Sequence, residues 1–137
     1  MSKLVFNTRD ELVVVDTELI AVVQANGNYS RVVYINKRET MLSVGITQME
    51  KAIANAKNKK HKLIRLGRSL LVNHSYLQKI DVLKQQIILS DGVNEIKLNV
   101  SKRMLKSYKD AIVKSIKIKN DGKTDNLGNG GYTTFQD

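Results

Sequence analysis

The chain has 137 residues, about the size of one ordinary domain, and carries a formal net charge of +10 at pH 7. It contains no cysteine, no apolar run that approaches the roughly 18 residues of a membrane span, and no secretory signal at its N-terminus. These features argue against disulfides, thiolate metal sites and membrane insertion, and we expect a cytoplasmic protein.

The start of the chain predicts a hairpin. Leu4, Phe6, Leu12 and Val14 alternate with polar neighbours, and such alternation is typical of paired strands. Residues 8–11, with the sequence Thr-Arg-Asp-Glu, provide the polar turn between the two strands.

A second hairpin is predicted around Asn26-Gly27-Asn28. Asn-Gly is the commonest dipeptide of a tight hairpin turn because both positions tolerate positive φ. Branched and apolar residues fill the flanking segments 19–24 and 31–35, and a further short strand is predicted at 40–44.

The clearest helix of the first half follows that strand. Thr47 and Glu50 fit a capping box, and Met49 and Ile53 recur at helical spacing. The basic run 57–62 is interpreted as the solvated end of this helix, with nonspecific phosphate contact as the open alternative.

The second half predicts short strands and a final helix. Ser101 caps that helix, whose apolar side chains recur on one side while lysines and arginines occupy much of the rest. The predicted strands cover 62–66, 70–72, 79–83, 86–89 and 95–98, with turns at 73–76 and 90–92. The apolar residues of the helix are Met104, Leu105, Tyr108, Ala111, Ile112 and Ile116.

Positive charge is concentrated in one part of the chain. Residues 1–56 hold six Lys or Arg and six Asp or Glu, whereas residues 57–118 hold fifteen against four. A localised basic region is expected of a nucleic-acid binder, and the alternative is a solvated face with a high pI. Residues 119–137 are rich in Gly, Asn, Asp and Thr without a period, so we expect one domain over 1–118 and a flexible C-terminal tail over 119–137.

The most informative segment runs from Leu63 to His74, because it places two cations in an apolar, strand-prone run. Arg65 and Arg68 stand among residues that would otherwise be core. Burying a guanidinium without a partner is unfavourable, so such arginines tend to lie at a surface that meets an anion. The segment therefore indicates an anionic partner, and DNA is the partner we expect.

This segment resembles the central motif of the LytTR family of bacterial DNA-binding domains, which form the output end of many response regulators. The shared pattern is an apolar-Ile-Arg-apolar stretch, then Arg68-Ser69, an apolar pair and Val72-Asn73. Similarity also extends, in order, over residues 18–30, 49–53, 77–80, 87–92 and 100–106. The resemblance implies a mostly β (α+β) fold, an elongated arrangement of short antiparallel strands with two helices and DNA-entering loops.

The resemblance also implies a function. We expect sequence-specific binding of double-stranded DNA and regulation of transcription, on paired direct repeats that two protomers occupy as a homodimer. No receiver domain fits beside a domain of this size, so we expect control through expression level, a regulatory protein partner or the tail.

Three segments supply the donors that base reading and phosphate contact require. The resemblance implies that Arg68 points toward the groove, that Asn73 is structural and that a residue near Ser30 lies at the bases. This chain has Gly67 where the family often has His, and Lys102 where it often has Arg. The predicted DNA-contacting residues are Asn28, Tyr29, Ser30 and Arg31 in the first segment, Arg65, Arg68 and Ser69 in the second, and Ser101, Lys102 and Arg103 in the third.

No arrangement of residues indicates an enzyme, a metal site or a cofactor. His61 and His74 have no carboxylate at ligand spacing, and His74 beside Ser75 is interpreted as part of a turn. Two binding alternatives remain. One is a basic adaptor that docks an acidic partner or an anionic membrane surface. The other is an RNA binder, which the small number of aromatic residues disfavours.

Overall fold

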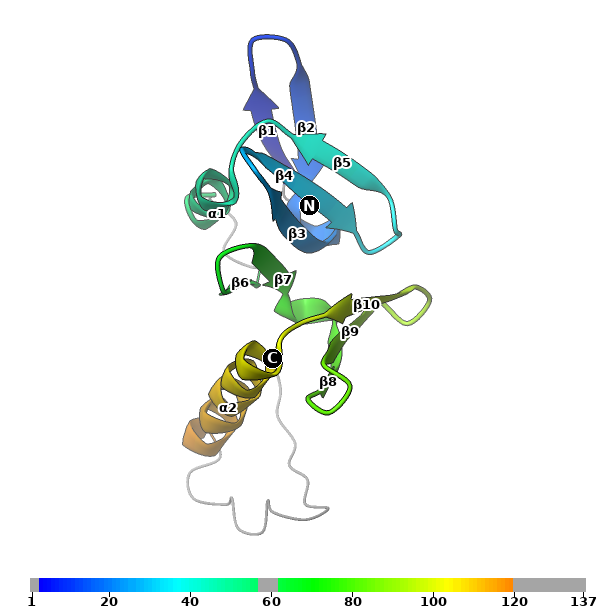
Figure 1. The fold of residues 1–137 in the computed structure, drawn as a ribbon. Coiled ribbons are helices and arrows are strands. Elements are labelled where there is room, and N and C mark those ends of the chain that lie inside the picture. Colours follow the sequence, from blue (N-terminus) through cyan, green and yellow to red (C-terminus); the bar gives the residue numbers. More distant parts are fainter. Residues whose placement is uncertain (1–2, 57–61, 120–137) are drawn as a thin grey trace.

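The computed structural model describes residues 3–56 and 62–119, which form three antiparallel sheets and two α-helices (Figure 1). The first sheet is a hairpin of β1 (Lys3–Asn7) and β2 (Leu12–Asp16). The central sheet has the order β5 (Glu39–Leu42), β4 (Tyr29–Tyr34), β3 (Ile20–Asn26), β7 (Leu70–Asn73), β6 (Leu63–Leu66). The third sheet has the order β10 (Glu95–Asn99), β9 (Gln86–Ser90), β8 (Leu77–Asp81), and the helices are α1 (Ile46–Ala54) and α2 (Lys102–Lys119). The expected mostly β fold with two helices is confirmed.

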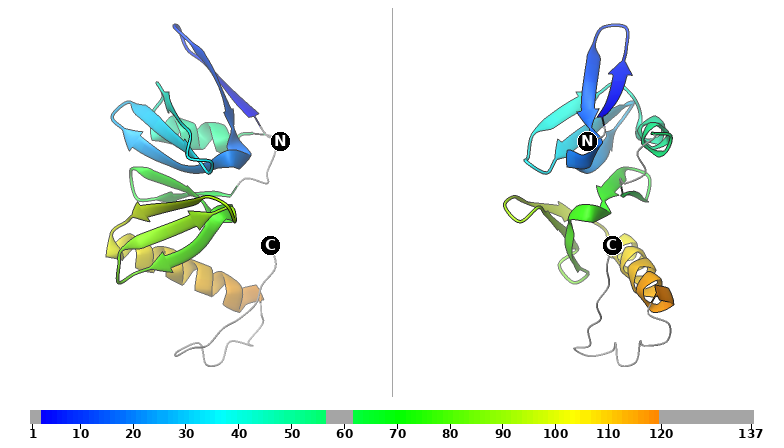
Figure 2. Two further views of the ribbon diagram at one scale, coloured as in Figure 1. Left: turned by 90° about the vertical axis from the view of Figure 1, so that its right-hand side faces the viewer. Right: turned by 180° about the vertical axis from the view of Figure 1, so that it is seen from behind.

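The central sheet is covered on both faces. Val23 and Leu71 join a core with Met49 of α1, whereas Val22 and Val72 join a second core that the third sheet and α2 complete (Figure 2). Successive side chains of a strand point to opposite faces. Residues 20–23 of β3 and 70–72 of β7 are therefore apolar without alternation, because each residue in turn is buried on one face or the other.

The third sheet and α2 build the second core together. Leu105 is fully buried and Tyr108 is 4% exposed, and both lie in one cluster with Ile87 and Leu89 of β9. The predicted cap of α2 is confirmed, because the Ser101 hydroxyl accepts a hydrogen bond from the Met104 amide at 3.4 Å.

The β1–β2 hairpin forms as predicted, but the alternation of Leu12 and Val14 does not mark its buried face. Val15 is fully buried and pairs with Leu4, whereas Leu12 is 60% exposed and Val14 is 49% exposed. Residues 12–15 are all apolar. Because the pattern within β2 is continuous, the packing of the hairpin on the domain decides which face is buried.

The predicted capping box of α1 is wrong. The helix begins at Ile46 after Gly45, which makes no side-chain cap hydrogen bond. The Glu50 carboxylate instead accepts a hydrogen bond from Arg65, at 2.7 Å from Nη1. The carboxylate that the local pattern assigns to a cap is therefore used in a long-range ion pair.

Some predicted boundaries shift and some predicted segments lie outside the described residues. Strand β8 begins two residues before the predicted strand, and the predicted turn after β7 contains a 3-10 turn at His74–Tyr76. The predictions for most of the basic run, 57–61, and for the tail beyond residue 119 fall outside the described residues. Within 3–56 and 62–119, neither helix has an apolar stretch long enough to span a membrane.

Candidate nucleic-acid interface

Three predicted segments converge at one side of the molecule. They are the β3–β4 turn (26–29), the β6–β7 turn (67–69) and the start of α2 (101–103), which we call together the turn edge (Figure 2, left). The Ala25 amide donates to the Ser69 carbonyl at 2.9 Å. A groove of about 320 Å³ is lined by Ser69 of the β6–β7 turn, by Ser101 at the start of α2 and by Ala25, which precedes the β3–β4 turn.

Arg65 braces the β6–β7 turn from within. Its Nε donates to the Gly67 carbonyl at 3.0 Å and its Nη2 donates to the Arg68 carbonyl at 2.7 Å. Its Nη1 pairs with Glu50 on α1 at 2.7 Å. The guanidinium thus has its partners inside the protein, and in this arrangement it supports the turn.

Arg68 and Ser69 point from this braced turn to solvent. Both residues are exposed, and neither side chain makes a hydrogen bond or ion pair to the described residues. Gly67 has φ of +66°, and a Cβ built there would lie 2.6 Å from the Met104 sulfur of α2. The backbone under Arg68 is therefore held by Arg65 on one side and packed against α2 on the other.

The β3–β4 turn contributes two exposed polar side chains. Asn26 pairs with Tyr29 at the end of the hairpin, and Gly27 has φ of +63°. Asn28 is exposed and Tyr29 is 50% exposed, so both are accessible donors at the turn edge.

Arg31 lies on the strand surface behind this turn. Its guanidinium pairs with Glu39 of β5 at 2.6 Å and donates to the Gln24 side-chain oxygen of β3 at 2.6 Å. The hydrogen bond from Arg31 lowers the pKa of the Glu39 carboxyl below its usual value. These contacts tie three strands together, so Arg31 is engaged within the sheet in this structure.

Ser30 is fully buried, and its hydroxyl donates to the Val44 carbonyl at 2.7 Å. The side chain therefore fixes the segment after β5 and is not exposed at the turn edge in this structure. Asn73 is also structural, as expected, because its amide nitrogen donates to the Ile20 carbonyl at 2.8 Å and its side-chain oxygen accepts from the Ser75 amide at 2.9 Å.

We expect the Ser30→Ala substitution to lower the free energy of unfolding by about 1 kcal/mol, because a hydrogen bond to a partly buried carbonyl is lost. The DNA sequence preference should stay the same, because the hydroxyl faces inward. Urea unfolding and a duplex titration measure the two quantities. Unchanged stability together with a lost base preference would return Ser30 to the set of readers.

The start of α2 adds cationic groups. Lys102 and Arg103 are exposed and have no side-chain partner among the described residues. The first turn of a helix also presents free amides and the positive end of the helix dipole, which favour a phosphate.

Sequence analysis missed Lys84, which lies beside this helix end. Lys84 and Gln85 line a shallow groove with residues 99–101, and the Val100 amide donates to the Gln85 carbonyl at 3.0 Å. The sequence does show a cation, Lys84, in the polar connection between β8 and β9. The pairing of that connection with the residue before Ser101 is a long-range contact, which the local pattern does not contain.

Comparisons with known proteins agree with the fold. A family model described as the LytTr DNA-binding domain matches residues 10–113. A solved structure of a LytTr DNA-binding domain from Bacillus cereus is similar in fold, with a TM-score of 0.54 at 17% sequence identity, and the match covers 82% of this chain and 97% of that one. No curated protein matches the chain.

Proposed function

The chain belongs to the LytTR family of DNA-binding domains, since the family model matches most of its length, and we propose that it reads duplex DNA sequence through the turn edge and so regulates transcription. The observation that carries this proposal is that three separate segments, each with exposed donors or cations, lie on one side of the molecule (Figure 2, left). Such a surface can contact base edges and flanking phosphates together.

We assign base reading to the two turns. Arg68 is the main candidate, because its guanidinium fork matches O6 and N7 of guanine, and Asn28 can pair in the same way with adenine. We assign Tyr29 and Ser69 to hydrogen bonds with phosphate or base edges. We assign Arg31 and Arg65 as supports, since each guanidinium group pairs with a carboxylate of this chain.

Phosphate contacts are assigned to the helix end. Lys102, Arg103 and Ser101 stand at the start of α2, and Lys84 lies beside them. Contacts to phosphate fix the register of a protein on the duplex and carry no sequence information of their own. We therefore propose that the two turns contact the bases and that the start of α2 contacts the phosphates.

The target arrangement we propose is a pair of direct repeats, each bound by one protomer. The support for this is family resemblance alone. A duplex with two repeats in the same orientation should bind two protomers, and a duplex with one repeat should bind one, as measured by the mass of each complex. Equal stoichiometry on both duplexes would remove this part of the proposal and leave DNA binding itself intact.

The salt dependence of affinity tests the proposed function directly. If the basic surface neutralises about six phosphates, log affinity should fall against log salt with a slope near −5 on duplex DNA. A fluorescence titration at several salt concentrations measures it. A slope near zero would contradict DNA binding, and equal affinity for polyglutamate would favour an adaptor for acidic partners.

A further inference from the structure

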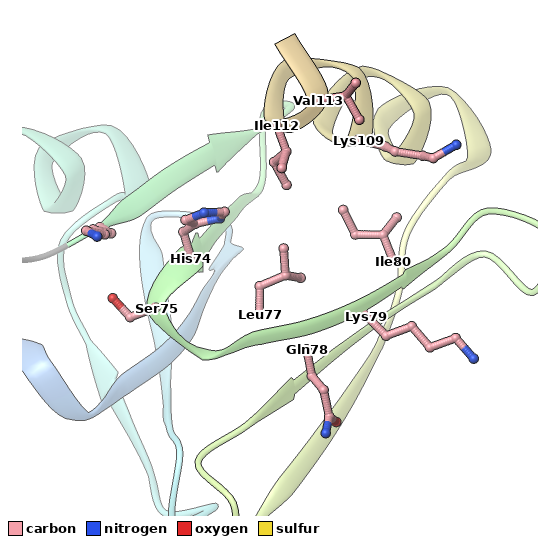
Figure 3. Close-up of a pocket in the computed structure, with 10 residues that line it drawn as sticks. His74, Ser75, Leu77, Gln78, Lys79, Ile80, Lys109, Ile112 and Val113 are labelled. Atoms are coloured by element: carbon pink, nitrogen blue, oxygen red, sulfur yellow. The ribbon is translucent and has the colours of Figure 1, made fainter. Parts of the chain in front are cut away.

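A cavity lies between β8 and α2, at the far end of β7 from the turn edge (Figure 3). Its volume is about 470 Å³, within the usual range of small-molecule sites. Leu77 and Ile80 of β8 and Ile112 of α2 point into the space, and Val113 lies beside them. The cavity thus has an apolar interior that a hydrocarbon group can contact.

The lining of this cavity carries positive and no negative side chains. Lys62, Lys79 and Lys109 are among its lining residues, although the Lys79 side chain points away from the space (Figure 3), and no Asp or Glu is among the described residues that line it. The carboxylate of Asp81 lies 3.7 Å from the Lys79 ammonium and offsets part of that charge. Lys109 is exposed and has no such partner among the described residues. An anionic group at the rim would therefore be attracted, whereas a cation would be repelled.

One wall of the cavity is joined to α2 by a hydrogen bond and lies away from the turn edge. His74 Nδ1 and the Tyr108 hydroxyl share a hydrogen bond at 2.8 Å, which joins the end of β7 to the middle of α2. Burial raises the pKa of the Tyr108 hydroxyl, so this group stays protonated at neutral pH. Ile112 lies ten residues along α2 from Lys102, about 15 Å at the rise of an α-helix. A small molecule bound beside Ile112 would leave the turn edge uncovered.

We propose that this cavity is a binding site for a small amphiphilic anion, in which a short hydrocarbon body lies on Leu77, Ile80 and Ile112 and a carboxylate lies near Lys109. The volume of about 470 Å³ fits a molecule of that size. The ammonium of Lys109, which has no carboxylate partner among the described residues, selects the anion over a neutral molecule of the same shape. This site is distinct from the proposed DNA-binding surface.

Calorimetric titration of the full chain with octanoate tests the proposal, with 1-octanol and acetate as matched probes. We expect saturable binding of one octanoate per chain, and at least about tenfold weaker binding of 1-octanol, which lacks the charge, and of acetate, which lacks the hydrocarbon body. Amide resonances of residues 77–80 and 109–113 should shift on titration. Equal binding of octanoate and 1-octanol, or shifts elsewhere in the chain, would overturn the proposal.

Two charge reversals on α2 sharpen the test. Lys109→Glu should weaken octanoate binding by about fivefold or more, because it places a like charge at the rim. Lys106→Glu changes the net charge equally but lies outside the cavity lining, so its affinity should stay within about twofold of the parent protein. Equal loss in both variants would show a nonspecific charge effect and refute the site. Neither readout involves DNA, so failure here is distinct from failure of the proposed function.

Discussion

Replacing Arg68 with alanine is expected to weaken binding to the cognate duplex by about 1 to 3 kcal/mol, which is about five- to 150-fold in affinity, and to relax the preference at one base position. The reason is the geometry of the β6–β7 turn. The guanidinium is exposed without a protein partner among the described residues, while Arg65 holds the Arg68 carbonyl at 2.7 Å. Because the backbone is already held, only the side chain has to be ordered when this donor meets a base. Titrating the variant against the cognate duplex and its single-base changes measures both effects.

The matched control for Arg68 is Lys102→Ala. Both substitutions remove one exposed cation from the turn edge, but the proposed contact of Lys102 is a phosphate. We expect Lys102→Ala to weaken cognate and random duplexes alike and to flatten the salt slope by about one unit. If Arg68→Ala also weakened both duplexes equally, Arg68 would be a clamp, and base reading would have to be assigned to the β3–β4 turn.

The arginines of the central segment show how far the sequence predicts the site. Two guanidinium groups in an apolar run predicted that both meet an anion at the surface. In the structure the two side chains have different environments. Arg65 satisfies its donors with Glu50 and two backbone carbonyls, whereas Arg68 is left exposed. Spacing alone could not separate the two roles, because Glu50 is fifteen residues away and belongs to α1.

The same limit applies to Ser30. A serine close to an Asn-Gly turn is expected to be an exposed hydrogen-bond donor. The Ser30 hydroxyl instead donates to the Val44 carbonyl, fourteen residues later in the sequence. By contrast, local rules predicted the hairpin turns and the Ser101 cap, because those features depend on neighbours within about four residues. The elements of the fold were thus predictable, and the orientation of individual side chains within the site depended on pairings between distant segments.

The second prediction concerns the two turn glycines with nearly equal backbone angles, Gly27 at φ +63° and Gly67 at φ +66°. Alanine in this left-handed region costs about 1 to 2 kcal/mol at either position. A Cβ at Gly27 would meet no atom within 4 Å, whereas one at Gly67 would lie 2.6 Å from the Met104 sulfur.

We therefore expect Gly27→Ala to lower the free energy of unfolding by about 1 to 2 kcal/mol through backbone strain alone, and Gly67→Ala to lower it by up to about 1 kcal/mol more, because the end of the flexible Met104 side chain must also move. Urea unfolding of both variants isolates the packing contribution as their difference. A Met104→Ala change should reduce that difference, since it removes the atom that the new Cβ would meet. Equal losses in the two glycine variants would show that contact with α2 does not hold the β6–β7 turn. The larger loss at Gly67, together with weaker cognate binding by that variant, would indicate that packing between this turn and the start of α2 sets the spacing between the proposed reading and clamping groups.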